Sequence, residues 1–261
     1  MKLRTISKLL LLISIVLMAF GIIDHLWLSF SVPGLTAITT LCTFAFAVTH
    51  GVQRYGWRGL LILLVLVVLI SLAFESVGVA TGSVYGPYHY TDKLGPKFLN
   101  LVPYLIPAAW FMMMYASLVI AESLLGSRTG PDWQKALSTA ALGGLVMTAW
   151  DVGMDPLMVA GGHWVWEVQG AYFGVPLQNY WGWWLTSFCA LLAFLLIVRP
   201  RALKTEKAVV PASWAVLAYA AMGCSTVLMD LFTGLGGAGM AGLFAMLPWA
   251  WMGWLSARSV S

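Results

Sequence analysis

The chain has 261 residues, of which 61% are hydrophobic and only 9% are charged, with a net charge of +4. Soluble proteins carry roughly 25% charged residues, so this composition excludes a soluble fold as well as a disordered chain. It predicts one integral membrane domain over residues 1–261. The basic residues stand in short clusters between apolar runs, where membrane orientation explains them without nucleic-acid binding.

Apolar runs of nearly 20 residues predict an all-α bundle of about eight transmembrane helices. The expected helices are 9–28, 35–52, 59–77, 102–122, 136–155, 181–198, 212–232 and 240–256. The first run follows Lys2, Arg4 and Lys8, as in a signal peptide, but no small-x-small cleavage site follows it. We therefore expect an uncleaved first helix.

The basic residues predict that both termini are cytoplasmic, in the cell membrane. Under that orientation the inner segments hold 12 of the 14 Lys and Arg residues, and the outer segments hold only Lys93 and Lys97. The inner ones are Lys2, Arg4, Lys8, Arg54, Arg58, Arg128, Lys135, Arg199, Arg201, Lys204, Lys207 and Arg258. The outer loops 78–101 and 156–180 are rich in Gly, Pro and aromatic residues, and we expect them to cap the active site.

Four acids are expected at one depth of the bundle. Asp24, Glu75, Asp151 and Asp230 each follow the cytoplasmic flank of an outward-running helix by 16 to 19 residues. At 1.5 Å per residue this places them about 24 to 28 Å deep in a hydrocarbon core of about 30 Å. Charged residues in a membrane span indicate function. The alternative is that they mark helix ends in interfacial water.

Asp155 lies one turn after Asp151, on the same helix face. The Asp155–Pro156 pair also fits a helix start, with Asp as the N-cap and Pro at the first helical position. Glu75 and Asp151 are therefore the preferred catalytic pair, one as proton donor and the other as base. A carboxyl group can donate a proton near neutral pH when apolar surroundings keep it protonated.

Several cofactor motifs fail on inspection. The run 234–239 matches the dinucleotide pattern G-x-G-x-x-G, but it joins two membrane helices without a preceding strand, so we expect a tight turn. The four histidines are unpaired at helical spacing, and the three cysteines lie in apolar runs without metal-ligand spacing. The sequence therefore predicts no metal and no cofactor.

Two long segments carry a family resemblance. They are 74–96 (FESVGVATGSVYGPYHYTDKLGP) with 102–107 (VPYLIP), and 150–160 (WDVGMDPLMVA) with 162–167 (GHWVWE), 170–176 (GAYFGVP) and 179–183 (NYWGW). Together they resemble the CruF-type family of carotenoid hydratases, which includes bacterial carotenoid 1,2-hydratases and archaeal bisanhydrobacterioruberin hydratases. The resemblance covers about residues 70–185.

The resemblance implies that water adds across the terminal C=C of an acyclic carotenoid end, giving a tertiary alcohol without redox chemistry or an organic cofactor. The candidate catalytic residues are Glu75, Asp151, Asp155, Tyr88, His89, Tyr90, Asp24 and Asp230. The candidate substrate-binding residues are Trp110, Trp150, Trp164, Trp166, Glu167, Tyr172, Phe173, Asn179 and Trp183. Aromatic faces stabilise a carbocation without adding to it, although an interfacial aromatic belt has the same composition.

The implied partners are membrane lipid, a lycopene-like carotenoid and water, with other carotenoid-pathway membrane enzymes as further candidates. Two other functions stay open on the sequence alone. A non-catalytic carotenoid or lipid carrier needs the same apolar slot without an acid. A small transporter also carries intramembrane acids, but its site usually lies near the midplane.

Overall fold

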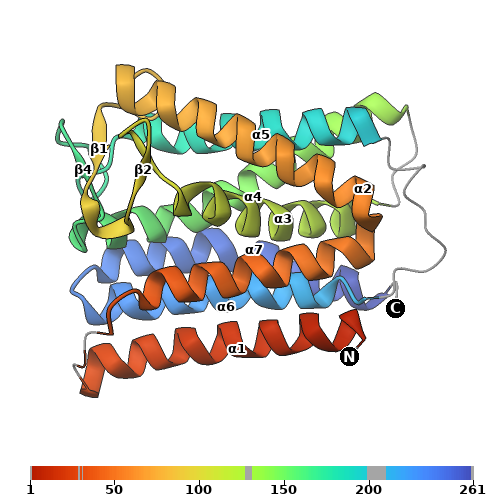
Figure 1. Ribbon diagram of the computed structural model, residues 1–261, viewed down its shortest axis with the longest axis horizontal. Helices are drawn as coiled ribbons and strands as arrows, with labels where there is room; N and C mark the ends of the chain where they lie inside the picture. Colours follow the sequence, from red (N-terminus) through yellow and green to blue (C-terminus); the bar gives the residue numbers. More distant parts are fainter. Residues whose placement is uncertain (1, 29, 31, 127–130, 199–209, 260–261) are drawn as a thin grey trace.

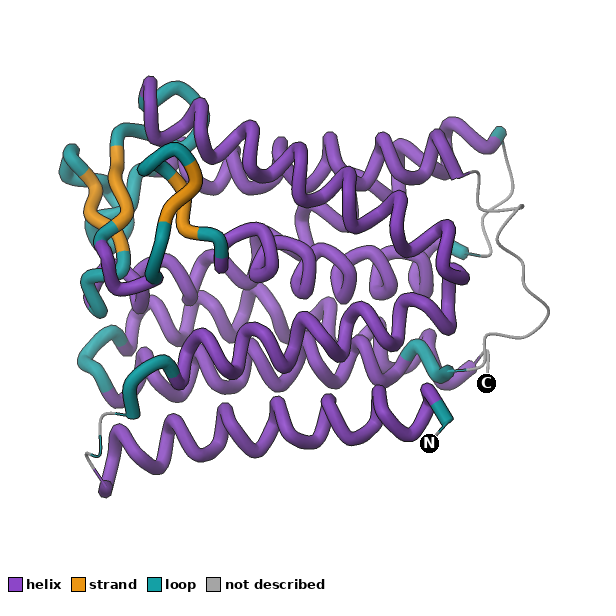
Figure 2. Tube along the Cα trace, viewed as in Figure 1, coloured by secondary structure: helices purple, strands orange, loops and turns teal. Residues whose placement is uncertain are grey.

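The computed structural model describes residues 2–28, 30, 32–126, 131–198 and 210–259. In that part of the chain the fold is all-α, with seven α-helices side by side in one bundle and short strands at one end (Figures 1 and 2). The helices are α1 (Leu3–Ile23), α2 (Leu35–Thr81), α3 (Leu105–Leu125), α4 (Asp132–Ala160), α5 (Leu177–Val198), α6 (Ser213–Phe232) and α7 (Gly236–Ser259). The helix α1 begins, and α7 ends, at the end of the bundle opposite the strands.

The prediction of eight helices is wrong in number. The expected helices 35–52 and 59–77 are parts of one assigned helix, α2, of 47 residues. Gly56 alone interrupts it, with φ 69° and ψ 171°, a conformation that favours glycine. The chain turns back there, so that 35–55 and 57–81 run in opposite directions (Figure 1). The reversal needs one glycine and no connecting loop.

Two further expectations at helix ends are corrected. The helix α4 continues through Asp155 and Pro156 to Ala160, so Asp155 is not the N-cap of a new helix. The helix α7 begins at Gly236 rather than at residue 240, and the turn before it uses the positive φ of 84° at Gly234. Both changes shorten the connections between helices. The continuation of α4 also places Asp155 inside the bundle.

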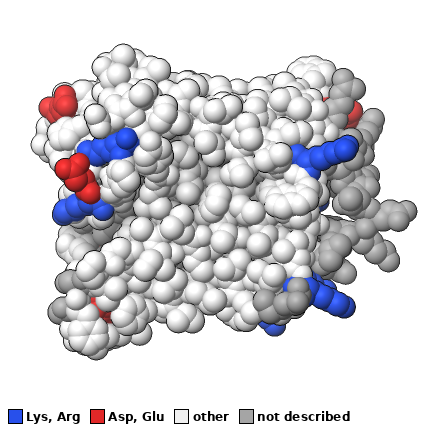
Figure 3. Space-filling view, in the orientation of Figure 1, with Lys and Arg blue, Asp and Glu red and all other residues white. Residues whose placement is uncertain are grey.

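The surface and the helix lengths indicate an integral, multi-pass membrane protein. Within the described residues, six helical segments are long and apolar enough to cross a membrane: α1 with its π-helical extension η1 (Asp24–Leu28), α2, α3, α5, α6 and α7. The helix α4 is long enough but more polar, since it carries Asp151 and Asp155. On the face shown in Figure 3, charged side chains lie near the two ends and leave an uncharged band between them.

The orientation predicted from the basic residues stays a prediction. Several of the residues on which it rests lie outside the described part of the chain. These are Arg128, Arg199, Arg201, Lys204 and Lys207.

The helix α3 forms the centre of the bundle. Every side chain from Phe111 to Ala121 is buried, which explains why this helix is apolar on all sides instead of along one stripe. It packs against α2, α4, α6 and α7. Large side chains such as Trp110 and Tyr115 are almost completely buried. The core therefore encloses the middle of α3 on all sides.

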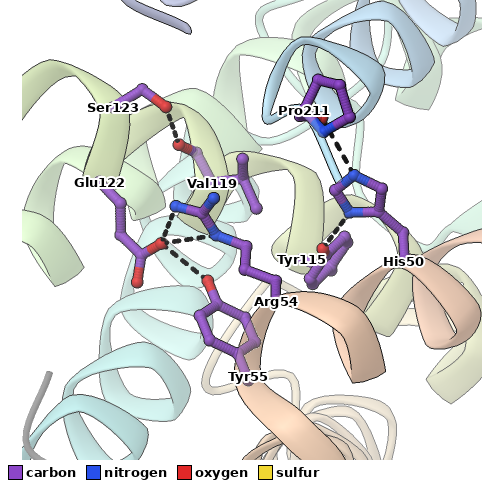
Figure 4. A network of polar contacts seen from close by, with 8 residues as sticks. All are labelled: His50, Arg54, Tyr55, Tyr115, Val119, Glu122, Ser123 and Pro211. Atoms are coloured by element: carbon purple, nitrogen blue, oxygen red, sulfur yellow. Dashed lines mark hydrogen bonds and ion pairs between the residues drawn. The ribbon is translucent and has the colours of Figure 1, made fainter. Parts of the chain in front are cut away.

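A polar network joins the helices at the end opposite the strands (Figure 4). Arg54 donates to Glu122 Oε2 through Nε at 3.1 Å and Nη2 at 2.7 Å, and Tyr55 Oη donates to the same oxygen at 2.9 Å. His50 is hydrogen-bonded to Tyr115 and to the Pro211 carbonyl oxygen. These contacts tie α2 to α3 and to the start of the α6 region, next to the reversal at Gly56.

The strands form two small antiparallel pairs. The strand β1 (Tyr88–Tyr90) pairs with β4 (Trp164–Trp166), and β2 (Lys97–Phe98) pairs with β3 (Val102–Pro103). The short 3-10 helix η2 (Asp92–Leu94) lies between β1 and β2. The β1–β4 pair joins the two long connections that carry the sequence motifs.

Candidate active site

Glu75 is the centre of the site. It lies near the end of α2, is only 3% exposed and accepts three hydrogen bonds. Tyr88 and Tyr90 donate through their hydroxyl groups to Oε2, the second at 2.9 Å, and Trp110 Nε1 donates to Oε1 at 2.9 Å. All three donors are neutral groups. Both oxygens of this carboxyl group are therefore held in fixed positions without a basic side chain.

The two tyrosines act as hydrogen-bond donors throughout the ordinary pH range. Burial, followed by the charge of Glu75, raises the pKa of Tyr88 and the pKa of Tyr90 well above the usual value of a phenol. They lie in β1, at the end of the bundle. Each phenol therefore stays protonated when it faces the carboxyl group.

Asp151 and Asp155 form a second acidic group on α4. The side-chain nitrogen of Asn179 donates to Asp151 Oδ2 at 2.8 Å and to Asp155 Oδ2 at 2.6 Å. Trp164 Nε1 donates to Asp155 Oδ1 at 2.6 Å. Asp151 Oδ1 is buried and, within the described residues, has no hydrogen-bond partner. The two carboxyl groups therefore share one amide in an apolar setting.

The β1–β4 pair supplies donors to both acidic groups. Tyr88 faces Trp166 across the pair, and Tyr90 faces Trp164, with ring centroids 5.0 and 5.7 Å apart. Side chains alternate along a strand, so these four rings lie on the face that packs on the bundle. The same small ribbon thus contacts Glu75 through its tyrosines and Asp155 through Trp164.

These groups border a partly open, mostly apolar cavity of about 170 Å³. Its wall includes Glu75, Asp155 and Asn179. Trp110 stacks on Trp183 with ring centroids 4.1 Å apart. The remaining wall residues are Thr36, Thr40, Tyr85, Tyr88, Tyr90, Leu94, Leu105, Ile106, Ala109, Met112, Trp150, Met154, Leu157, Met158, Trp164, Trp166, Met222 and Thr226.

The structure brings most of the predicted site residues together. In the preferred pair of Glu75 and Asp151, however, Asp155 takes the place of Asp151 at the cavity. The cavity wall carries Asp155 in place of Asp151, which lies behind it and reaches it through Asn179. The reason is that α4 continues past Pro156, so Asp155 keeps its helical position. Of the predicted substrate-binding residues, the wall includes Trp110, Trp150, Trp164, Trp166, Asn179 and Trp183.

Other predicted residues lie away from the cavity wall. His89 and Glu167 are more than half exposed and contact each other on the outer side of the ribbon, with Nδ1 and Oε1 3.4 Å apart. Phe173 is 46% exposed, and Tyr172 donates to the Val152 carbonyl oxygen at 3.0 Å. These four residues lie in the loops around the cavity and do not line it.

The remaining two acids are also separate from the cavity. Asp24 Oδ1 accepts a hydrogen bond of 2.8 Å from the backbone N–H of Phe30, so it closes the turn after α1. Asp230 is fully buried beside Gly153, and its two oxygens have no hydrogen-bond partner among the described residues. Of the four acids predicted at one depth, Glu75 lines the cavity and the other three do not; Asp155 is the second acid of its wall among the described residues.

Sequence reasoning missed several wall residues. Tyr85 is almost completely buried and its hydroxyl is hydrogen-bonded to Thr186 at 2.8 Å. Met154 and Met158 follow Trp150 at intervals of four residues, a spacing that places all three on one helix face. That spacing was available in the sequence as a signal for the wall.

The fold and the site define a class: a helical membrane protein whose apolar, aromatic cavity holds two buried carboxyl groups at one end of the bundle. The chain belongs to the family of carotenoid biosynthesis proteins, whose family model matches residues 34–248. The family resemblance seen in the motifs is thereby confirmed.

One relative in this family has a named activity. The chain is 39% identical over 131 residues to the bisanhydrobacterioruberin hydratase of Haloarcula japonica. The matched region is 50% of this chain and 43% of that protein, so the chain matches less than half of the relative's length. No solved structure matches the chain.

Proposed function

We propose that this protein is a carotenoid hydratase, a hydro-lyase that adds water to the terminal C=C of an acyclic carotenoid end group and forms a tertiary alcohol. One observation carries the proposal: Glu75 and Asp155 face the same small aromatic cavity from different helices. Hydration of an alkene needs a proton donor and a proton acceptor at the two sides of one reacting bond.

In this proposal the Asp151–Asp155 pair supplies the proton. Two carboxyl groups that share Asn179 in apolar surroundings hold a proton between them, as coupled acid pairs do. Asp155 is the member of the pair that faces the cavity. It protonates the less substituted alkene carbon, and the positive charge then develops on the neighbouring tertiary carbon.

Aromatic rings and Glu75 support the next step. The faces of Trp110 and Trp183 lie in the cavity wall and stabilise a cation electrostatically without reacting with it. Glu75 accepts three hydrogen bonds from neutral donors, which offset part of the cost of burying its carboxylate form. That carboxylate orients the incoming water and takes its proton as the C–O bond forms.

The atoms balance without a redox partner. One proton leaves Asp155 for carbon, one water oxygen bonds to the tertiary carbon, and one proton passes from that water to Glu75. The net change is the addition of one water molecule. Proton transfer from Glu75 back to the aspartate pair then restores the starting state.

The experiment is hydration by the purified protein in detergent. Lycopene is incubated with the protein in ¹⁸O-labelled water, and the pigments are separated and analysed by mass spectrometry. The proposal expects a more polar pigment whose new hydroxyl group carries the label, with no addition of NAD(P)H. A protein that binds lycopene and leaves it unchanged would instead be a carotenoid carrier.

A further inference from the structure

A second cavity adjoins the candidate active site. It has a volume of about 580 Å³ and lies between α1, the first half of α2, the end of α4 and α6. Among the described residues that line it, none is Asp, Glu, Lys or Arg. Its lining is mostly apolar and also includes His25, His163 and several Thr side chains, so it offers a mainly apolar space beside the acidic cavity.

The two cavities share a wall made by three helices. Each helix contributes two residues that line both spaces: Thr36 and Thr40 from α2, Leu157 and Met158 from α4, and Met222 and Thr226 from α6. The shared wall makes the cavities neighbours, with the acids in one and α1 beside the other.

The volumes of the two cavities limit which part of a carotenoid each can hold. A cavity of about 150 Å³ binds a molecule on the order of benzene, so the acidic cavity of about 170 Å³ accepts an end group and excludes a long chain. A carotenoid is a long, apolar polyene. Once its end group reaches Glu75 and Asp155, the rest of the chain must lie outside that cavity, and the second cavity is the larger space beside it.

We propose that the second cavity is the binding site for the polyene chain of the substrate, which it receives between α1, α2 and α6. This inference rests on the proposed hydratase function and adds the place where the long part of the substrate lies. The half-buried residues Gly21 on α1 and Ser225 on α6 line this site from two different helices. Larger side chains at these positions take up part of its space.

The test measures binding of lycopene itself. An achiral polyene acquires circular dichroism in the visible range when a protein holds it in a chiral site, whereas detergent gives no such signal. We expect the signal with the wild type, and we expect Ser225→Trp to raise the Kd at least about 10-fold, equivalent to about 1.4 kcal/mol. Gly21→Leu is expected to do the same from the α1 side.

The control variants introduce the same residue on the same helix as the cavity variants. Leu231→Trp on α6 and Val16→Leu on α1 change side chains that are 44% and 64% exposed and lie outside both cavities. Both controls should bind lycopene like the wild type. Because the two cavity variants lie on different helices, failure of one to fold leaves the other as the test.

The outcomes separate this inference from the hydratase proposal. Cavity variants that bind lycopene with the wild-type Kd overturn the polyene site, even if the protein hydrates lycopene. A wild type without induced dichroism overturns it as well. A wild type that binds lycopene, loses binding in both cavity variants and forms no alcohol supports the polyene site and overturns the hydratase.

Discussion

Replacing Glu75 by glutamine removes the proposed base while keeping the shape of the side chain. The amide oxygen can accept from Tyr88 and Tyr90, as Oε2 does in the structure. The amide nitrogen then faces Trp110 Nε1, a donor that lies 2.9 Å from Oε1. Two donors oppose each other there, and one buried unsatisfied group costs about 1–3 kcal/mol of folding free energy.

The effect on turnover is larger than the effect on folding. A glutamine cannot accept the proton from water, and loss of a general base lowers the rate by about 10²- to 10⁴-fold. We therefore expect kcat for lycopene hydration to fall by that factor, while the thermal midpoint in detergent falls modestly. Pigment separation gives the rate, and thermal denaturation of the same samples gives the stability.

A double variant separates the two effects. Adding Trp110→Phe to Glu75→Gln removes the opposing N–H and keeps an aromatic ring beside Trp183, so it should recover part of the stability without recovering activity. Asp92→Asn is the control acid, since Asp92 is fully exposed and paired only with Lys97 within the described chain. Glu75→Gln protein that inserts normally and hydrates lycopene at the wild-type rate would refute the assignment of Glu75 as base.

Three other outcomes are expected. Asn179→Leu removes the amide shared by the aspartate pair and should lower kcat about 10²-fold, as misplacement of a catalytic group does; unchanged kcat would contradict the pair. Glu122→Ala leaves Arg54 without its carboxylate partner and should lower the unfolding free energy by about 3 kcal/mol, seen as a lower thermal midpoint with the same pigment product. Cysteines placed at Thr91 and Gln169 should react with impermeant thiol reagents from the outer side of the membrane, and reaction from the cytoplasmic side alone would reverse the predicted orientation.

The sequence predicted the fold class and the elements of the site because both depend on local composition. Apolar runs indicated membrane helices, and acids within those runs stood out because charge is costly in a membrane. Glu75 and Asp155 were both found in this way. The choice of Asp151 over Asp155 was wrong about the cavity wall, because a proline after an aspartate also fits a helix start and only the three-dimensional packing carries α4 through Pro156.

The elements that the sequence did not predict depend on contacts between distant segments. The strands β1 and β4 have three residues each and lie in segments rich in glycine, so no periodic sequence pattern predicts them. Their register, Tyr88 opposite Trp166, joins residues far apart in the chain. The reversal between residues 52 and 59 was expected, but its form was not: Gly56 alone turns the chain, where the prediction placed a connecting loop.

The ribbon of β1 and β4 has a consequence for how this sequence can change over evolutionary time. Tyr88 and Tyr90 are buried at its inner face, whereas His89 between them is exposed. A single inserted or deleted residue in either strand reverses these faces, turning an imidazole inward and both phenols outward. Length variation among descendants of this chain should therefore collect outside the ribbon and occur within it only as compensated pairs.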